Sequence, residues 1–153
     1  LKKAGFLVIV VTNQAGIARG YYNEEDMAEL HTIINAELQK HSALIDGFYH
    51  CPHHPEFGEI RECECRKPMP GLIKQAKHDF DIDMRRSWIV GDKVSDVQSG
   101  ISAGVRPLLV LTGYGAEQST LLPAQVIRVS DIAEACDYII THTSQIETNS
   151  AQN

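Results

Sequence analysis

The sequence has no long apolar run. No stretch approaches the roughly 20 consecutive apolar residues of a transmembrane helix, and no signal-peptide pattern is present. Basic residues are in the minority, because 14 Lys and Arg face 20 Asp and Glu, for a formal net charge of -6. Aromatic residues make up only 7% of the chain, and they do not alternate with basic ones. We therefore expect neither a membrane nor a nucleic acid as a partner.

Cysteine is scarce as well. The chain has 4 cysteines in 153 residues, and Cys63 and Cys65 are too close in sequence for an easy disulfide bond. The rest of the composition is that of an ordinary cytosolic domain, so we expect reduced thiols and a cytoplasmic protein. The length suits one core that buries about two thirds of the unfolded chain's surface. We expect a monomer with one domain at 1–143 and a disordered polar tail at 144–153.

Three of the cysteines fall in one short run, CPHHPEFGEIRECECRKP. This run supplies four soft and borderline donors for a tetrahedral zinc ion: Cys51, His53, Cys63 and Cys65. His50 and His54 are alternatives to His53, but alternation in an extended segment points His53 to the same side as Cys51, so we favour His53. Four protein ligands leave no open coordination position, which predicts a structural zinc. Two cations follow the last ligand at once, and they suggest an anion nearby.

Apolar and β-branched runs alternate with helical patterns along the whole chain. We expect strands at 6–11, 45–51, 87–92, 106–113 and 125–131, and helices at 24–40, 70–80, 95–103 and 132–141. Asn23 can cap the first helix, whose apolar residues are spaced to make one face: Met27, Leu30, Ile33, Ile34 and Leu38. This alternation predicts an α/β fold with a doubly wound, Rossmann-like sheet, and active groups at the carboxyl ends of its strands.

Phosphate-binding side chains gather at those strand ends. Thr12, Asn13 and Gln14 follow the first strand, and Asp92 and Lys93 follow the third. Arg66 and Lys67 follow the zinc run. Hydroxyl and amide donors, cations and a carboxylate able to hold magnesium suit a phosphoryl group. Alone, Thr12 and Asn13 would indicate only an ordinary strand-to-loop turn.

The ordered set VVTNQ, RKP and IVGDKVSD resembles motifs two, three and four of the haloacid dehalogenase (HAD) superfamily of phosphatases. The segments CPHH…CEC and TNQAGIARG resemble its D-glycero-D-manno-heptose 1,7-bisphosphate phosphatase branch, with histidinol-phosphatases as near relatives. The resemblance implies magnesium-dependent hydrolysis of a phosphate monoester on a sugar bisphosphate, in a HAD fold with a zinc loop instead of a large cap domain. The alternatives are a histidinol-phosphate phosphatase and a zinc-stabilised phosphate-binding module without chemistry.

The resemblance also implies roles for the residues of the first two motifs. Thr12 and Asn13 would bind the phosphoryl oxygens, and Gln14 and Ala15 would complete the substrate contacts of that loop. Lys67 would neutralise the charge that grows on the transferred group.

Further roles follow for the remaining cation and the fourth motif. Arg66 would grip the substrate, and Asp92 would hold magnesium. Lys93 would lie against substrate or metal, and Asp96 would orient the loop. A helix N-cap is the rival role for Asp92.

One element of the superfamily pattern is missing. The nucleophile would be the first Asp of a DxD motif after an apolar strand, whereas the D-x-D at Asp81 to Asp83 follows a helical segment and is a decoy. The opening LKKAGF is typical of a last helical turn that stops at Gly5. We therefore expect the first strand and its DxD motif upstream of Leu1, no phosphatase activity in this fragment alone, and no direct pairing of strands 6–11 and 87–92.

Overall fold

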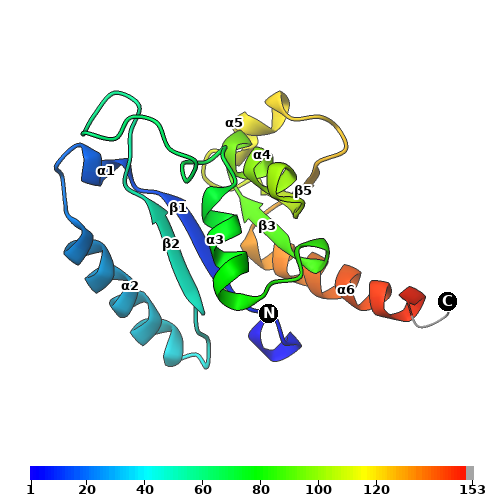
Figure 1. Ribbon diagram of the computed structural model, residues 1–153. Coiled ribbons are helices and arrows are strands. Elements are labelled where there is room, and N and C mark those ends of the chain that lie inside the picture. The colour runs from blue at the N-terminus through cyan, green and yellow to red at the C-terminus, as the bar shows by residue number, and fades with distance from the viewer. Residues whose placement is uncertain (151–153) are drawn as a thin grey trace. The chain divides into compact units, whose positions relative to one another are not determined.

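A computed structural model describes the backbone of residues 1–150 and the side chains of residues 1–143. The chain divides into two compact units, Leu1–Asp79 and Phe80–Asn153. Each unit is a mixed α/β structure whose strands are all parallel (Figure 1). The expected α/β class is therefore confirmed. No helix in the described part is both long and apolar enough to cross a membrane.

The first unit is built around one pair of parallel strands. Its elements in chain order are η1 (Lys2–Ala4), β1 (Ile9–Asn13), α1 (Ala15–Ala18), α2 (Glu24–Gln39), β2 (Gly47–Cys51) and α3 (Gly71–Phe80). The register places Thr12 opposite His50 and Asn13 opposite Cys51. Parallel strands run the same way, so the end of β1 and the start of the zinc run share one edge of the sheet. Gly5 ends η1 with a left-handed φ of 80°, as LKKAGF predicts.

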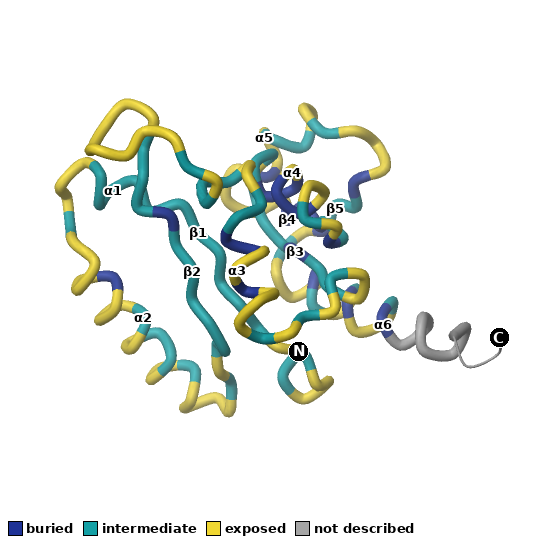
Figure 2. Tube along the Cα trace, in the orientation of Figure 1, coloured by how far each residue is buried: buried dark blue, intermediate teal, exposed yellow. Residues whose placement is uncertain are grey.

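Helix α2 begins where the sequence predicts. Asn23 Oδ1 accepts the Asp26 N–H at 2.9 Å, and Asp26 Oδ2 accepts the Asn23 N–H at 2.8 Å, which completes a capping box. The apolar face is buried less than its spacing suggests, because only Met27 is buried while Leu30 and Ile33 are 46% and 52% exposed. Figure 2 shows this mostly exposed helix. Periodicity identifies the apolar side of a helix but not how much of it the fold covers.

The second unit carries a three-stranded sheet in the order β3-β4-β5. Its elements in chain order are η2 (Met84–Arg86), β3 (Trp88–Gly91), α4 (Val94–Ala103), β4 (Arg106–Val110), α5 (Gly115–Gln118), η3 (Ser119–Leu121), β5 (Ile127–Val129) and α6 (Ile132–Ser150). The middle strand holds the centre of the core, since Leu108 and Leu109 are fully buried. Leu109 clusters with Val97 of α4 and with Val126.

Every predicted strand and helix is present, but several boundaries differ. β4 ends at Val110 instead of 113, and β5 spans only Ile127–Val129. The first strand begins at Ile9, later than predicted, and includes Thr12 and Asn13. Two short helices, α1 and α5, were not predicted, because four residues are too few to show a helical period. The last helix continues past the predicted end at 141 to Ser150, and no Gly or Pro stands after 141 to stop it. Residues 151–153 lie outside the described residues, so disorder there stays a prediction.

The described strands form two sheets rather than one. β1 pairs only with β2, and β3 pairs only with β4 within residues 1–150. The absence of direct pairing between the first and third strands stays a prediction, because these strands belong to different units.

The start of α4 depends on a buried carboxylate. Asp96 is 6% exposed, and its Oδ2 accepts the Lys93 N–H at 3.0 Å. A Cβ on Gly91 would lie 2.4 Å from that oxygen, so glycine leaves room for the bond. The predicted loop-orienting role of Asp96 agrees with this geometry. Lys93, not Asp92, occupies the N-cap position, so the rival N-cap role of Asp92 is wrong.

We expect Asp96→Ala to lower the free energy of unfolding by about 1–2 kcal/mol, because it removes the acceptor that caps the helix through the Lys93 N–H. Asp96→Asn keeps an oxygen at that position and should cost less. Urea unfolding of the two variants measures the difference. Equal losses in both would contradict a capping role.

Candidate metal centre and phosphate site

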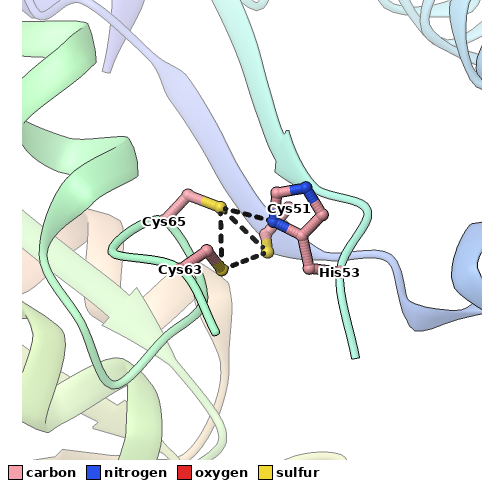
Figure 3. Close-up of side chains that lie close together, drawn as sticks. All are labelled: Cys51, His53, Cys63 and Cys65. Atoms are coloured by element: carbon pink, nitrogen blue, oxygen red, sulfur yellow. Dashed lines mark hydrogen bonds between the residues drawn. The ribbon is translucent and has the colours of Figure 1, made fainter. Parts of the chain in front are cut away.

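The predicted zinc ligands lie together in the first unit. The ligand atoms of Cys51, His53, Cys63 and Cys65 are all within 4.8 Å of one another. Cys51 is the last residue of β2, and the other three lie in the segment that follows it. In Figure 3 the three sulfurs and the imidazole point toward a common centre. The sequence prediction of this cluster is confirmed as a group that could hold a metal ion.

The spacing within the cluster fits zinc. Tetrahedral zinc with Zn–S bonds of about 2.3 Å places sulfurs about 3.8 Å apart. The three Sγ–Sγ distances are 3.1, 3.2 and 3.6 Å, and His53 Nδ1 lies 3.4 Å from Cys65 Sγ. A disulfide would need about 2.05 Å, and all the cysteines are free. Zinc would bind here as a closed structural site, because four donors complete its coordination.

The other two candidate histidines have different partners. His50 Nε2 is hydrogen-bonded to Glu24 Oε2. His54 Nε2 accepts from Arg19 Nη2 at 3.2 Å, and the Arg19 guanidinium lies 4.7 Å from the centre of the Phe57 ring. The geometry places His53, rather than His50 or His54, with the three thiols, and its role as the ligand stays a prediction. Arg19 thus contacts two residues of the segment that follows β2.

Crowding three thiols together separates their pKa values. Burial raises the pKa of Cys51 and of Cys65. Burial also opposes ionisation of Cys63, but hydrogen bonds from Cys65 and His53 outweigh it and lower the pKa of Cys63 to about 6. The protein groups alone thus favour one thiolate, whereas a divalent cation among the sulfurs would stabilise all three.

Two hydrogen bonds to backbone carbonyls fix the far end of the zinc segment. The Gly71 N–H, at the start of α3, donates to the Glu64 carbonyl at 2.9 Å. A Cβ on Gly71 would lie 2.3 Å from that oxygen, so only glycine permits this approach. Arg66 Nη1 donates to the carbonyl of the ligand His53 at 2.9 Å. The first cation after the cluster is therefore tied to a ligand residue.

Lys67 is fixed to the end of β1 by its side chain and its backbone. Its Nζ donates to the Val11 carbonyl at 2.7 Å, one residue before Thr12. The Asn13 side chain accepts the Lys67 N–H and donates to the Lys67 carbonyl, both at 3.0 Å. The structure thus brings the lysine ammonium beside the Thr12 strand end. The Asn13 amide is engaged with Lys67, so its side chain positions the lysine.

The turn after β1 is tied to the metal cluster as well. Gln14 donates its backbone N–H to the Cys51 carbonyl at 2.8 Å and its Nε2 to Thr12 Oγ1 at 3.2 Å. Ala15 follows as the first residue of α1. Four of the predicted substrate-binding residues therefore form one continuous edge with the metal ligand Cys51.

Asp92 and Lys93 belong to the second unit. Asp92 Oδ2 accepts the Tyr114 N–H at 3.0 Å, and its other oxygen has no hydrogen-bond partner among the described side chains. One hard carboxylate oxygen of this kind fits magnesium, which binds one or two carboxylates and keeps several waters. The Lys93 carbonyl accepts from Asp96 and Val97, and Lys93 Nζ lies 4.3 Å from the centre of the Tyr114 ring. Lys93 therefore suits a substrate contact better than a metal ligand.

Comparison with known proteins matches this arrangement. A family model described as "HAD-hyrolase-like" matches residues 64–135. The chain is 46% identical over 130 residues to D-glycero-alpha-D-manno-heptose-1,7-bisphosphate 7-phosphatase of Burkholderia mallei, which covers 83% of this chain and 69% of that protein. The chain belongs to the heptose-bisphosphate phosphatase family of HAD-like hydrolases.

Other members of the heptose-bisphosphate phosphatase family match too. The chain is 44% identical over 118 residues to the beta-anomer 7-phosphatase of Yersinia pestis, covering 74% of this chain and 62% of that protein. The chain thus spans about two thirds of the length of these relatives. The crystal structure of D,D-heptose 1,7-bisphosphate phosphatase from B. bronchiseptica, complexed with magnesium and phosphate, superposes with a TM-score of 0.78 at 28% identity, over 97% of this chain and 78% of that one.

The D-x-D sequence has a local structural role in this family member. Asp83 accepts the Arg85 N–H at 3.0 Å and caps η2. Asp81 lies directly after α3 with a positive φ of 50°. Neither residue follows a strand, as the sequence context predicts.

We expect one zinc ion per chain. Cys63→Ser should weaken zinc binding more than about 100-fold, because even outer-shell changes cost tenfold to 100-fold. Cys136→Ser is the matched control, since Cys136 lies on α6 outside the cluster. Zinc content after dialysis against a weak chelator measures both variants. Equal zinc retention in both would rule out the cluster as the site.

Proposed function

We propose that this chain forms the phosphate-binding part of a magnesium-dependent phosphatase that removes the 7-phosphate of D-glycero-D-manno-heptose 1,7-bisphosphate. The names of its relatives specify the 7-phosphate and divide between the alpha and beta anomers. The observation that carries the proposal is the contact of Lys67 Nζ with the Val11 carbonyl, which holds a cation at the residue before Thr12. A hydroxyl and an ammonium together suit a phosphoryl group.

Each group in the first unit then has a task. Thr12 donates its hydroxyl to a phosphoryl oxygen, and Lys67 neutralises charge on the transferred group. The Asn13 side chain keeps Lys67 in place by bonding the backbone N–H and carbonyl of the lysine. Arg66, held on the His53 carbonyl, binds the sugar phosphate. Preorganised donors of this kind are each worth about 3 kcal/mol in the transition state.

The second unit holds the candidate magnesium ligand. Asp92 would hold magnesium with the oxygen that Tyr114 leaves available. When bound, magnesium supplies positive charge to the phosphoryl oxygens. A Cβ on Gly113 would lie 2.4 Å from Asp92 Oδ2, so glycine keeps the carboxylate in this orientation.

The proposal assigns the nucleophile to a residue outside these 153. Among the described residues two D-x-D pairs overlap, Asp79 with Asp81 and Asp81 with Asp83. Asp79 lies within α3 and accepts the Tyr49 hydroxyl, Asp81 is a loop residue, and Asp83 caps η2. The 153-residue chain should therefore bind phosphate without hydrolysing a phosphate ester. We also propose a monomeric cytoplasmic protein with no nucleic-acid or membrane partner, since a thiol cluster requires a reducing compartment and the net charge is -6.

Titration calorimetry with the zinc-loaded chain and magnesium tests the proposal. We expect the heptose bisphosphate to bind more tightly than histidinol phosphate, and neither to release phosphate. Lys67→Ala should weaken binding at least about tenfold, because it removes a charged donor worth about 1.5–3 kcal/mol. Lys77→Ala removes an exposed charge from α3 of the same unit and should change nothing.

Three results would contradict the proposal. Equal losses of affinity in Lys67→Ala and Lys77→Ala would show that only the net charge of the unit matters, not the position of Lys67. Preference for histidinol phosphate would move the substrate to the neighbouring branch of the superfamily. Phosphate release abolished by Asp81→Asn would place the nucleophile inside the chain.

A further inference from the structure

A relay of hydrogen bonds runs from Tyr22 through Gln14 to Thr12. The Tyr22 hydroxyl donates to Gln14 Oε1 at 2.6 Å, and Gln14 Nε2 donates to Thr12 Oγ1 at 3.2 Å. These lengths agree with the amide orientation, because 2.6 Å suits an O–H···O bond and 3.2 Å suits only N–H···O. The Gln14 oxygen therefore faces Tyr22, and its nitrogen faces Thr12.

The direction of this relay determines what the Thr12 hydroxyl can do. A hydroxyl has one proton to donate and two lone pairs to accept with. Thr12 Oγ1 already accepts from Gln14, and no described residue accepts its proton. That proton is therefore available to a bound group.

We propose that Gln14 and Tyr22 are positioning residues that set the Thr12 hydroxyl as a donor to the phosphoryl group. This inference rests on the proposed function, in which Thr12 binds that group. Gln14 acts through Thr12 and Tyr22 acts through Gln14, so neither needs to touch the substrate.

The loop between α1 and α2 is shaped to bring Tyr22 to this place. A Cβ on Gly16 would lie 2.2 Å from Tyr22 Cε1 and 2.6 Å from its hydroxyl oxygen. Gly20 has a φ of 72° in the turn that returns the chain, and the Tyr21 N–H donates to the Gly16 carbonyl at 2.9 Å. Glycine at 16 is thus required for the ring to approach Gln14.

A merely structural tether would behave differently from a relay. As a tether, the Tyr22 hydroxyl would stabilise the loop, and its removal would act on phosphate binding independently of Thr12. As part of a relay, its effect would pass through the Thr12 hydroxyl and disappear when that hydroxyl is absent.

A double-mutant cycle separates the two cases, with the affinity of the zinc-loaded chain for inorganic phosphate in magnesium as the readout. We expect Tyr22→Phe to weaken binding roughly three- to tenfold, the worth of one neutral hydrogen bond. The same change in a Thr12→Val background should have no effect. Tyr21→Phe is the matched control, because Tyr21 is the adjacent tyrosine and is 73% exposed.

Reversing the amide tests the direction of the relay. Gln14→Glu replaces the donor facing Thr12 with an acceptor, so the hydroxyl would donate to the carboxylate instead of to phosphate. We expect a larger loss of affinity than in Tyr22→Phe. In the ligand-free protein, NMR should show one Gln14 side-chain amide proton protected from exchange, and Thr12→Val, which removes its acceptor, should remove that protection.

The outcomes distinguish this inference from the proposed function. A wild-type chain that binds no phosphate overturns both. A wild-type chain that binds phosphate, with an equal effect of Tyr22→Phe whether or not Thr12→Val is also present, overturns only the relay. Unprotected Gln14 amide protons in the free protein overturn the relay as well.

Discussion

Metal coordination is the constraint on which the rest of the first unit depends. The stretch from 55 to 62 is exposed throughout, and even Phe57 and Ile60 are 42% and 52% exposed. Such a segment buries too little apolar surface to offset the entropy of ordering it. Zinc held by Cys51 and His53 before this stretch and by Cys63 and Cys65 after it would supply that missing free energy, because binding to such a site is also folding free energy. The cluster is therefore scaffolding, although it holds the densest chemistry in the chain.

Strand pairing and hydrogen bonds connect the metal cluster to the proposed phosphate-binding residues. Parallel pairing sets Asn13 opposite the ligand Cys51, whose carbonyl holds Gln14. On the other side of the cluster, Lys67 follows the ligand Cys65 after one residue and is clamped by the Asn13 amide. Asn13 at the strand end is thus the pairing partner of one metal ligand, and Lys67 lies two residues after another. Order in the metal cluster and order in the anion site are physically connected.

Much of this site could be predicted from the sequence, because the zinc ligands and the two cations lie in one short run of residues. The types and number of the ligands predicted the zinc cluster, and alternation in an extended segment favoured His53 among three histidines. The role of Asn13 could not be predicted in this way, since its amide meets the Lys67 backbone 54 positions away. Tyr22 was also missed, because its contact with Gln14 depends on a turn geometry that only the glycine at 16 hints at. The burial of α2 was overestimated for a related reason. The spacing of apolar residues shows which face of a helix is apolar, but not whether other elements pack against that face.

Linkage between zinc and phosphate tests the central claim most directly. The affinity for inorganic phosphate should be measured in the zinc-loaded chain, after chelation, and after zinc is restored, and the zinc affinity should be measured with and without phosphate. We expect chelation to weaken phosphate binding and restored zinc to recover it, with phosphate raising zinc affinity by the same factor, as reciprocity requires. Full phosphate affinity in the chelated chain would contradict the coupling of cluster and anion site.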